Sequence, residues 1–361
     1  MDPRIREHAE VLVDWSARVE PGDDVVVEVD EGSIPLAIAV AEVLGERESN
    51  PLLTFAGDDP IRAYLRSFPT TEFPEDPAHA LALYEETDVL LRLRGGTNTS
   101  AMADVPTATR QAYARARRSL TAARLETDWV STLHPTASLA QQAFMATEAF
   151  RDFVYEAILR DWAALADEMV TLKDALDAGS EVRLTTEQTD LTMSIDGRRA
   201  VNSAASVAYD SHNLPSGEVF TAPYATEGVV VFDVPMMVHG EPVRDVRLTF
   251  ESGEVVDIEA EVGQSVIEGI VETDEGARRL GELGIGMNRA IDRITNITLL
   301  DEKMGDTVHL ALGRAYDACL PEGESGNQSA VHVDLIADVS EGASIAIDGE
   351  VVQRDGRFAW E

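Results

Sequence analysis

The chain has 361 residues, 44% of them hydrophobic, and its 66 acidic residues against 29 basic ones give a formal net charge of −37. This length predicts two domains with sizeable cores, and the charge, spread along the whole chain, excludes the basic surface that nucleic-acid binding requires. We expect a cytoplasmic protein that binds no membrane and forms no internal disulfide, because the sequence contains no signal-peptide stretch, no run of roughly 20 apolar residues and a single cysteine.

The first part of the chain has the pattern of an α/β domain with a mainly parallel sheet. Asp2 followed by Pro3 predicts the N-cap and first turn of a helix. Residues 24–29 then predict a strand and residues 34–44 a helix that Gly45 ends. Further apolar runs at 52–55 and 89–93 alternate with helical segments, which is typical of a parallel sheet covered by helices.

Residues 137–178 predict a strongly helical region, with Phe144, Phe150, Phe153 and Trp162 filling a core. At residues 179 and 180 the hydrophobic period changes from helical to alternating. We therefore expect an N-terminal α/β domain over 1–179 and a C-terminal β-rich α+β domain over 180–361 that binds metal and carries the active site. Within the second domain, 266–283 predicts a mostly helical segment that places Glu282 near a helix end or in the loop after it.

Two of the seven histidines lie among carboxylates in the second domain. The alternation of residues 330–334 predicts a strand that presents His332 and Asp334 on one face, and 307–313 predicts another strand that contains His309 and ends before Tyr316. Imidazole nitrogen together with carboxylate oxygen suits zinc, cobalt or manganese. A strand histidine two residues from an aspartate is also typical of a core or edge position, so the neighbouring motifs decide between the two interpretations.

Several motifs in a fixed order resemble the aminopeptidase T family of metal-dependent exopeptidases. They are 213–223 (NLPSGEVFTAP), 281–288 (GELGIGMN), 301–303 (DEK), 309–316 (HLALGRAY) and 327–334 (NQSAVHVD), and they cover roughly the C-terminal half. The resemblance implies a homodimer that uses a water activated by two divalent metal ions to hydrolyse the N-terminal bond of peptides with a free N-terminus. The ligand or near-ligand positions that it implies are Glu218, Glu282, Glu302, His309, His332 and Asp334, with Tyr316 at the family's tyrosine.

Roles within this set stay open, and so do competing functions. Glu218 and Glu282 are expected as ligands, or one of them as the general base, and Tyr316 as a ligand or a donor to the oxyanion. The sequence departs from the family at Val333, and the spacing between Glu302 and His309 makes Glu302 the least secure ligand. The alternatives are a metallohydrolase of another amide or ester, and a metal-binding protein without catalytic activity.

Lysine is almost absent from this chain, since Lys173 and Lys303 are the only two. Dense acidic residues with so few lysines are typical of cytosolic proteins from salt-accumulating halophiles, and we expect a halophilic archaeon as the source. The alternative, an acidic mesophilic enzyme, leaves the scarcity of lysine unexplained. Lys303 lies directly beside Glu302, where it either neutralises excess carboxylates, contacts the substrate or forms a structural ion pair.

The remaining histidines are expected outside the metal site. His134 precedes Pro135 and is expected to be structural, and His212 is expected to stabilise a turn, with a substrate contact as the alternative. His8, His79 and His239 are expected to be structural or exposed.

Overall fold

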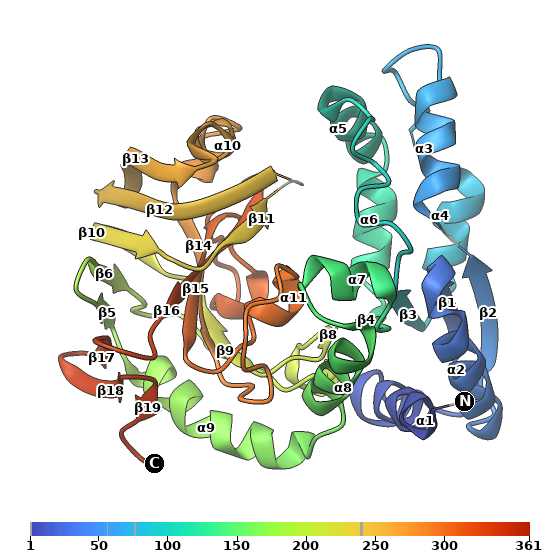
Figure 1. Ribbon diagram of the computed structural model, residues 1–361, viewed down its shortest axis with the longest axis horizontal. Coiled ribbons are helices and arrows are strands. Elements are labelled where there is room, and N and C mark those ends of the chain that lie inside the picture. Colours follow the sequence, from blue (N-terminus) through green and yellow to red (C-terminus); the bar gives the residue numbers. More distant parts are fainter. Residues whose placement is uncertain (1, 56, 76, 239–240) are drawn as a thin grey trace. The chain divides into compact units, whose positions relative to one another are not determined.

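The computed structural model describes residues 2–55, 57–75, 77–238 and 241–361, which form two compact units. The first unit comprises residues 1–160 and 205–215, and the second comprises 161–204 and 216–361. The elements of both units are labelled in Figure 1. The expected combination of a parallel α/β part and a β-rich part is confirmed. Among the described residues, no helix has both the length and the apolar character needed to cross a membrane.

The first unit is built on a five-stranded sheet in which every pair of neighbouring strands is parallel (Figure 1). In spatial order its strands are β2 (Asn50–Phe55), β1 (Asp24–Val29), β3 (Val89–Arg94), β4 (Asp128–Leu133) and β8 (Asn213–Leu214). The valine run of β1 is buried, as expected for a strand of a parallel sheet with helices on its faces. The strands predicted at 24–29, 52–55 and 89–93 are therefore confirmed.

Helices connect these strands, and the first begins where the sequence predicts. The side chain of Asp2 accepts a hydrogen bond from the backbone N–H of Arg4 at 3.1 Å, which caps α1. The helices of the first unit are α1 (Pro3–Glu10), continued by a π-helical turn (Val11–Ser16), α2 (Ile34–Glu46), α3 (Asp58–Ser67), α4 (Ala78–Glu85), α5 (Thr107–Arg115), α6 (Arg118–Leu125), α7 (Ala137–Gln142) and α8 (Thr147–Ile158).

The helical region predicted over 137–178 is interrupted twice, giving α7, α8 and α9 (Trp162–Ala178). Phe144 lies between α7 and α8 with φ +53°, a left-handed conformation that ends a helix, and it is 90% exposed. Its expected place in the core was therefore wrong. Phe150, Phe153 and Trp162 are buried, as predicted.

Helix α9 belongs to the second unit, although the sequence period suggested a boundary after it. The helix packs against β7 (Val201–Ser203) and β9 (Glu218–Thr221), and the buried Asn202 amide donates a hydrogen bond to the carbonyl of Ala166 at 2.9 Å. These contacts place the division between the compact units at 160 and 161, where a helix ends, rather than at the change of hydrophobic period near 179.

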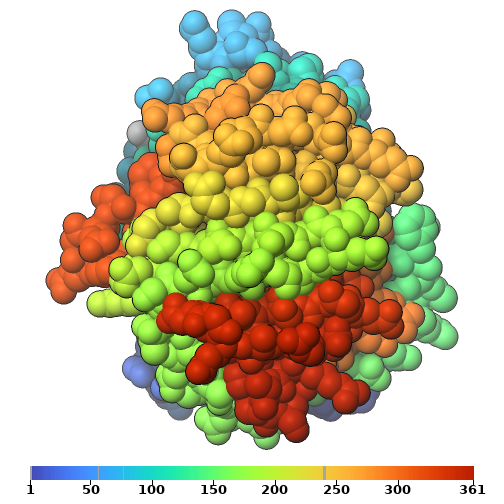
Figure 2. Space-filling view, turned by 90° about the vertical axis from the view of Figure 1, so that its left-hand side faces the viewer, coloured from blue at the N-terminus to red at the C-terminus, as the bar shows by residue number. Residues whose placement is uncertain are grey.

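Two sheets form most of the second unit. An antiparallel five-stranded sheet runs in the order β16 (His332–Asp338), β15 (Thr307–Gly313), β14 (Leu280–Gly286), β9 and β7. The nine-stranded sheet crosses the visible face in Figure 2 as successive bands. Its strands are β11 (Met236–Val238), β12 (Glu241–Glu251), β13 (Glu254–Val262), β10 (Tyr224–Phe232), β6 (Asp190–Ser194), β5 (Glu181–Thr185), β17 (Ser344–Ile347), β18 (Glu350–Arg354) and β19 (Arg357–Phe358).

The segment predicted as helical over 266–283 is helical only in its first part. Helix α10 covers Gln264–Val271, and Glu282 lies on β14 in the centre of the five-stranded sheet. The short helix α11 covers Thr298–Asp301. Strand β14 contains Gly281, Gly284 and Gly286, each pressed against backbone or a ring of a neighbouring segment. A hydrophobic period cannot reveal this requirement for close approach, which is why the helical prediction for Glu282 was wrong.

Candidate metal centre

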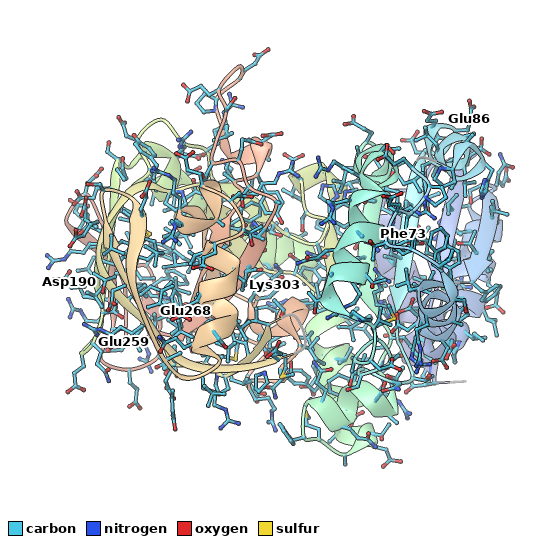
Figure 3. All side chains as sticks on the ribbon, turned by 90° about the horizontal axis from the view of Figure 1, so that it is seen from above. Phe73, Glu86, Asp190, Glu259, Glu268 and Lys303 are labelled. Atoms are coloured by element: carbon cyan, nitrogen blue, oxygen red, sulfur yellow. The ribbon has the colours of Figure 1, made fainter. Side chains whose placement is uncertain are left out.

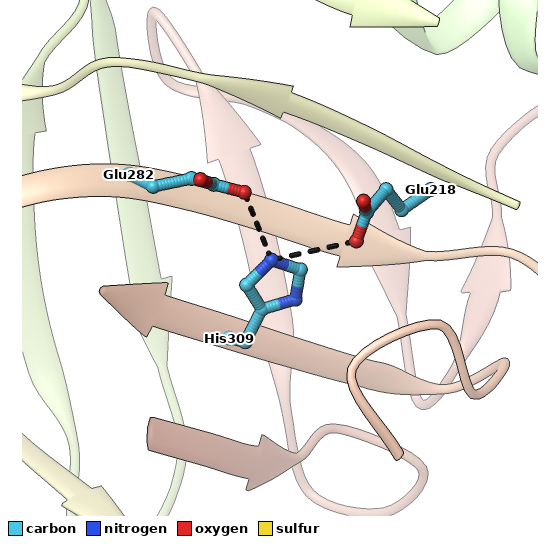
Figure 4. Close-up of side chains that lie close together, drawn as sticks. All are labelled: Glu218, Glu282 and His309. Carbon is cyan, nitrogen blue, oxygen red and sulfur yellow. Dashed lines mark hydrogen bonds and ion pairs between the residues drawn. The ribbon is translucent and has the colours of Figure 1, made fainter. Parts of the chain in front are cut away.

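Three adjacent strands of the five-stranded sheet bring Glu218, Glu282 and His309 together (Figure 4). Glu218 begins β9, Glu282 lies on β14 and His309 lies on β15. The His309 Nε2 atom is 3.2 Å from Glu282 Oε1 and 3.5 Å from Glu218 Oε2. All three side chains are buried, so the sheet register alone assembles two carboxylates around one imidazole.

A second group uses Glu282 again, together with His332 and Asp334 of β16. His332 Nε2 lies 3.3 Å from Glu282 Oε2 and 3.6 Å from Asp334 Oδ1. The strand at 332–334 was predicted from alternation, and residues two apart on a strand share a face. Each oxygen of Glu282 thus faces a different histidine, which makes this carboxylate common to both groups.

The separations between the donor atoms are those of ligands that share a metal ion. Ligand atoms about 2.0–2.2 Å from one tetrahedral ion lie about 3.3–3.6 Å apart, which matches the separations between the histidine nitrogens and carboxylate oxygens. The buried atoms Glu218 Oε2 and Glu282 Oε2 have no hydrogen-bond partner among the described residues. A histidine nitrogen lies 3.5 Å from the first and 3.3 Å from the second, so each buried oxygen has a histidine as its ion-pair neighbour, and both groups have the composition and spacing of metal sites.

The backbone beneath His309 is adapted to its ring. Gly284 is the register partner of His309 across β14 and β15, and a Cβ atom on Gly284 would overlap the Cε1 and Nε2 atoms of the ring. The imidazole therefore occupies the space that a side chain at position 284 would need, so only glycine fits there. This contact fixes the direction in which Nε2 points toward Glu218 and Glu282.

Burial and neighbouring charges strongly shift the pKa values of the ionisable groups in the site. Burial opposes the charged imidazolium of His309, but the hydrogen bond to Glu282 and the charge of Glu218 outweigh it and raise the pKa of His309 to about 9. His332 is similar, since burial is outweighed by Glu282 and Asp334, which raise its pKa to about 9. Burial and the nearby charge of Glu302 raise the pKa of Asp334 to about 6. Without a cation, the two imidazoles thus hold protons in a surplus of carboxylates.

Lys303 and Glu302 complete the acidic cluster from the loop after α11. Figure 3 labels Lys303 together with Asp190 and Glu259, which lie on the outside of the same unit. The Lys303 Nζ atom donates to Glu218 Oε1 at 2.5 Å and to Glu302 Oε1 at 2.7 Å, and the residue is only 3% exposed. Glu302, predicted as a ligand, is a member of neither group of three.

Tyr316 follows β15 and lies beside the second group. Its ring centroid is 4.8 Å from that of His332 and 5.9 Å from that of Phe220. Burial and the negative charges of Glu282 and Asp334 raise the pKa of Tyr316. Its hydroxyl therefore keeps its proton at neutral pH and is available as a donor.

Two contributors to the site were not singled out from the sequence. Phe220 lies two residues after Glu218 on β9, so the same alternation that places the glutamate could have placed this ring beside Tyr316. Asp301 is buried and accepts hydrogen bonds from the backbone N–H of Thr295 at 2.8 Å and from its hydroxyl at 2.6 Å. These bonds tie the loop before Glu302, and the sequence contains no local signal for them.

The other described histidines take no part in either group. His8 is buried against the Thr132 hydroxyl at 2.8 Å, and His134 is buried in the first unit. His212, expected to stabilise a turn, stacks on Trp129 with ring centroids 4.4 Å apart and contacts the Trp129 carbonyl. His79 is exposed on α4, and His239 lies outside the described residues.

Comparison with known proteins identifies the family and the fold of the chain. The sequence pattern of the thermophilic metalloprotease (M29) family matches residues 1–358. Aminopeptidase 2 of Geobacillus stearothermophilus is 27% identical over 416 aligned positions that cover 100% of this chain and 98% of the relative. Aminopeptidase T of Thermus aquaticus is 38% identical over 38% of this chain and 36% of the relative. The fold matches the wild-type AmpT structure from Thermus thermophilus with a TM-score of 0.86, 24% identity and 99% coverage of both chains.

Proposed function

The chain belongs to the thermophilic metalloprotease (M29) family, and from this premise we propose that it is a metal-dependent aminopeptidase. The relatives named aminopeptidase, one of them aligned over the whole chain, support the same activity. The observation that carries the proposal is the shared carboxylate of Glu282, whose two oxygens lie 3.2 Å from His309 Nε2 and 3.3 Å from His332 Nε2. A carboxylate placed in this way suits two neighbouring divalent ions.

We propose the five members of the two groups as the metal ligands: Glu218, Glu282, His309, His332 and Asp334. The mixture of imidazole and carboxylate donors suits zinc, cobalt or manganese. Glu302, the sixth ligand expected from the sequence, we place at the edge of the centre instead. Its Oε1 atom accepts a hydrogen bond from Lys303, and its other oxygen remains to take a proton from the attacking water.

When bound, the metal ions supply Lewis acidity and lower the pKa of water toward about 7. Two side chains supply the proton transfer and the hydrogen bond that the reaction also needs. Glu302 receives the proton of the nucleophile and can return it to the leaving amine. Tyr316 donates a hydrogen bond to the oxygen that becomes negative as the scissile carbonyl is attacked, since its phenol keeps its proton beside Glu282 and Asp334. We propose Glu218, which the sequence also allowed as the base, as a ligand, and its 3.5 Å separation from His309 Nε2 supports this role.

We propose peptides with a free N-terminus as substrates. The cluster contains four carboxylates, and a carboxylate oxygen near the scissile bond can bind the α-ammonium of the first residue. We further propose that the enzyme works in the cytoplasm as a homodimer, and that it is adapted to high salt by its charge of −37.

The experiment is a comparison of substrates in molar KCl. Hydrolysis of leucine amide is measured for the metal-loaded protein beside N-acetyl-leucine amide and a leucine ester. An aminopeptidase should prefer the free amide over the acetylated one by a factor on the order of a hundred or more in kcat/KM. Equal rates for the blocked and free amides would indicate another amidase, cleavage of the ester alone would indicate an esterase, and no turnover with metal bound would indicate a metal-binding protein without activity.

A further inference from the structure

One of the two lysines in the chain lies inside an acidic cluster that would itself bind cations. Lys303 is 3% exposed, whereas Lys173 lies on α9 and pairs with Asp177 four residues along the same helix. A buried lysine next to metal ligands competes with the metal for carboxylate oxygens. Its presence in the centre therefore needs a physical reason of its own.

The backbone of Lys303 is held by the same residue that holds the segment before Glu218. Asn288 donates its backbone N–H to the Lys303 carbonyl at 3.0 Å and its side-chain amide to the Ser216 carbonyl at 2.8 Å. The Gly305 N–H returns a hydrogen bond to the Asn288 carbonyl at 3.2 Å. These hydrogen bonds of Asn288 fix the Lys303 backbone relative to the strand that contains Glu218.

The Lys303 ammonium binds one oxygen of each of its two carboxylate partners. Lys303 Nζ binds Oε1 of Glu218 and Oε1 of Glu302, while Glu218 Oε2 faces His309 Nε2 at 3.5 Å. An ammonium has three donors and no lone pair when charged, so it holds carboxylates without becoming a ligand. One oxygen of each glutamate is thereby removed from the set that can contact a metal ion.

We propose that Lys303 is a positioning residue of the metal centre: it holds Oε1 of Glu218 and Oε1 of Glu302, so that each glutamate can act on a metal ion or on its water only through Oε2. This inference rests on the proposed function, because it assumes that metal ions occupy the two groups. Lys303 also neutralises part of the four-carboxylate cluster, which would otherwise be self-repelling in the metal-free protein. Without it, Oε1 of Glu218 and Oε1 of Glu302 become free to coordinate as well.

The test compares Lys303→Met and Lys303→Gln, which remove the charge, with Lys173→Met as the matched control. Each protein is loaded with Co²⁺, whose visible absorption weakens as its coordination number rises. Melting temperatures are measured with metal and after chelation, and kcat and KM are measured for leucine amide, all in molar KCl.

Both Lys303 variants should bind Co²⁺ with a weaker, shifted absorption band, and kcat should fall on the order of a hundredfold with KM changed much less. Chelation should lower their melting temperatures more than it lowers that of wild type. Lys173→Met should match wild type in every measurement. If Lys303→Met folds in neither state, Lys303→Gln decides the question, since it can still donate to one carboxylate.

Other results would overturn the inference. A Co²⁺ spectrum identical to that of wild type in a folded Lys303 variant would show that Lys303 does not set the coordination, even if the enzyme is an active aminopeptidase. Conversely, a shifted spectrum in the variants of a protein that hydrolyses no aminoacyl amide would reject the proposed function and support the role of Lys303. A wild-type protein that binds no Co²⁺ would reject both.

Discussion

The imidazole of His309 lies directly on the backbone of Gly284, its partner across β14 and β15, with no room for a Cβ atom between them. Gly284→Ala should therefore displace the ring and reduce bound metal, with a loss of activity of at least about tenfold and a stability cost of about 1–3 kcal/mol from overpacking. Gly269→Ala on α10 is the control, because nothing lies within 4 Å of its added methyl group. Elemental analysis of the bound metal checks the prediction. Equal metal content in Gly284→Ala and Gly269→Ala would contradict it.

Replacing either histidine of the centre should remove both metal and activity. His309→Ala or His332→Ala deletes one donor from a group of three, so hydrolysis should fall by at least about a hundredfold while the circular-dichroism spectrum with excess metal changes little. His79→Ala, on the exposed surface of α4, should leave both unchanged. Near-normal metal content in His309→Ala or His332→Ala would show that the ligands lie elsewhere.

In the metal-free protein, the free energy of unfolding should decrease at alkaline pH. The pKa values of His309 and His332 are raised to about 9 from an ordinary value near 6.5. Their stabilising charge is fully present below about pH 6.5 and is lost as the pH rises through about 9, at up to about 1.4 kcal/mol per pH unit for each group. Melting temperatures of the chelated protein from pH 6.5 to 9.5 measure this, and a constant value would contradict it.

Metal binding should have the opposite pH dependence in the same range. A ligating imidazole must be neutral, so binding displaces the protons held by His309 and His332, and affinity should rise between about pH 6.5 and 9. Calorimetry in two buffers of different ionisation enthalpy counts the released protons. Binding without proton release at pH 7 would mean that neither imidazole is protonated in the metal-free centre.

Screening of surface charge should control stability. With a net charge of −37, repulsion among surface carboxylates is weakest where the Debye length is about 3 Å, near 1 M salt, and strongest where it is about 30 Å, near 0.01 M. The melting temperature should therefore rise steadily from roughly 0.05 M to 3 M KCl. Sodium chloride at equal ionic strength serves as the comparison, and equal melting temperatures at the two ends of the range would disprove the adaptation to salt.

Much of the fold follows from local pattern, because the period of two on a strand is set by backbone geometry. Residues 24–29 and 307–313 form strands with the predicted limits, and the alternation at 332–334 places His332 and Asp334 on one face of β16. Phe144 shows the limit of the same reasoning. Its apolar side chain fits a helical pattern, but Phe144 lies after the end of α7 with a left-handed backbone and is exposed.

The contacts that complete the centre join residues far apart in sequence, where periodicity contains no information. Glu282 was expected near a helix end or in the loop after it, because 266–283 was interpreted as mostly helical. It lies instead on β14, where Gly284 allows the strand to pack under His309. The scarcity of lysine made Lys303 a candidate site residue. Its contacts with both Glu218 and Glu302 depend on the hydrogen bond from Asn288, which the sequence does not predict. Motif order could suggest the six metal-site positions, and only the geometry separates Glu302 from the others.

The most direct test of the central claim, a two-metal aminopeptidase centre, is to add Co²⁺ back to the chelated protein in molar KCl while hydrolysis of leucine amide and N-acetyl-leucine amide is followed. Activity on the free amide should appear only with metal and reach its maximum near two ions per chain, while the acetylated amide is hydrolysed on the order of a hundredfold more slowly. Full activity after chelation, or equal hydrolysis of both amides, would contradict it.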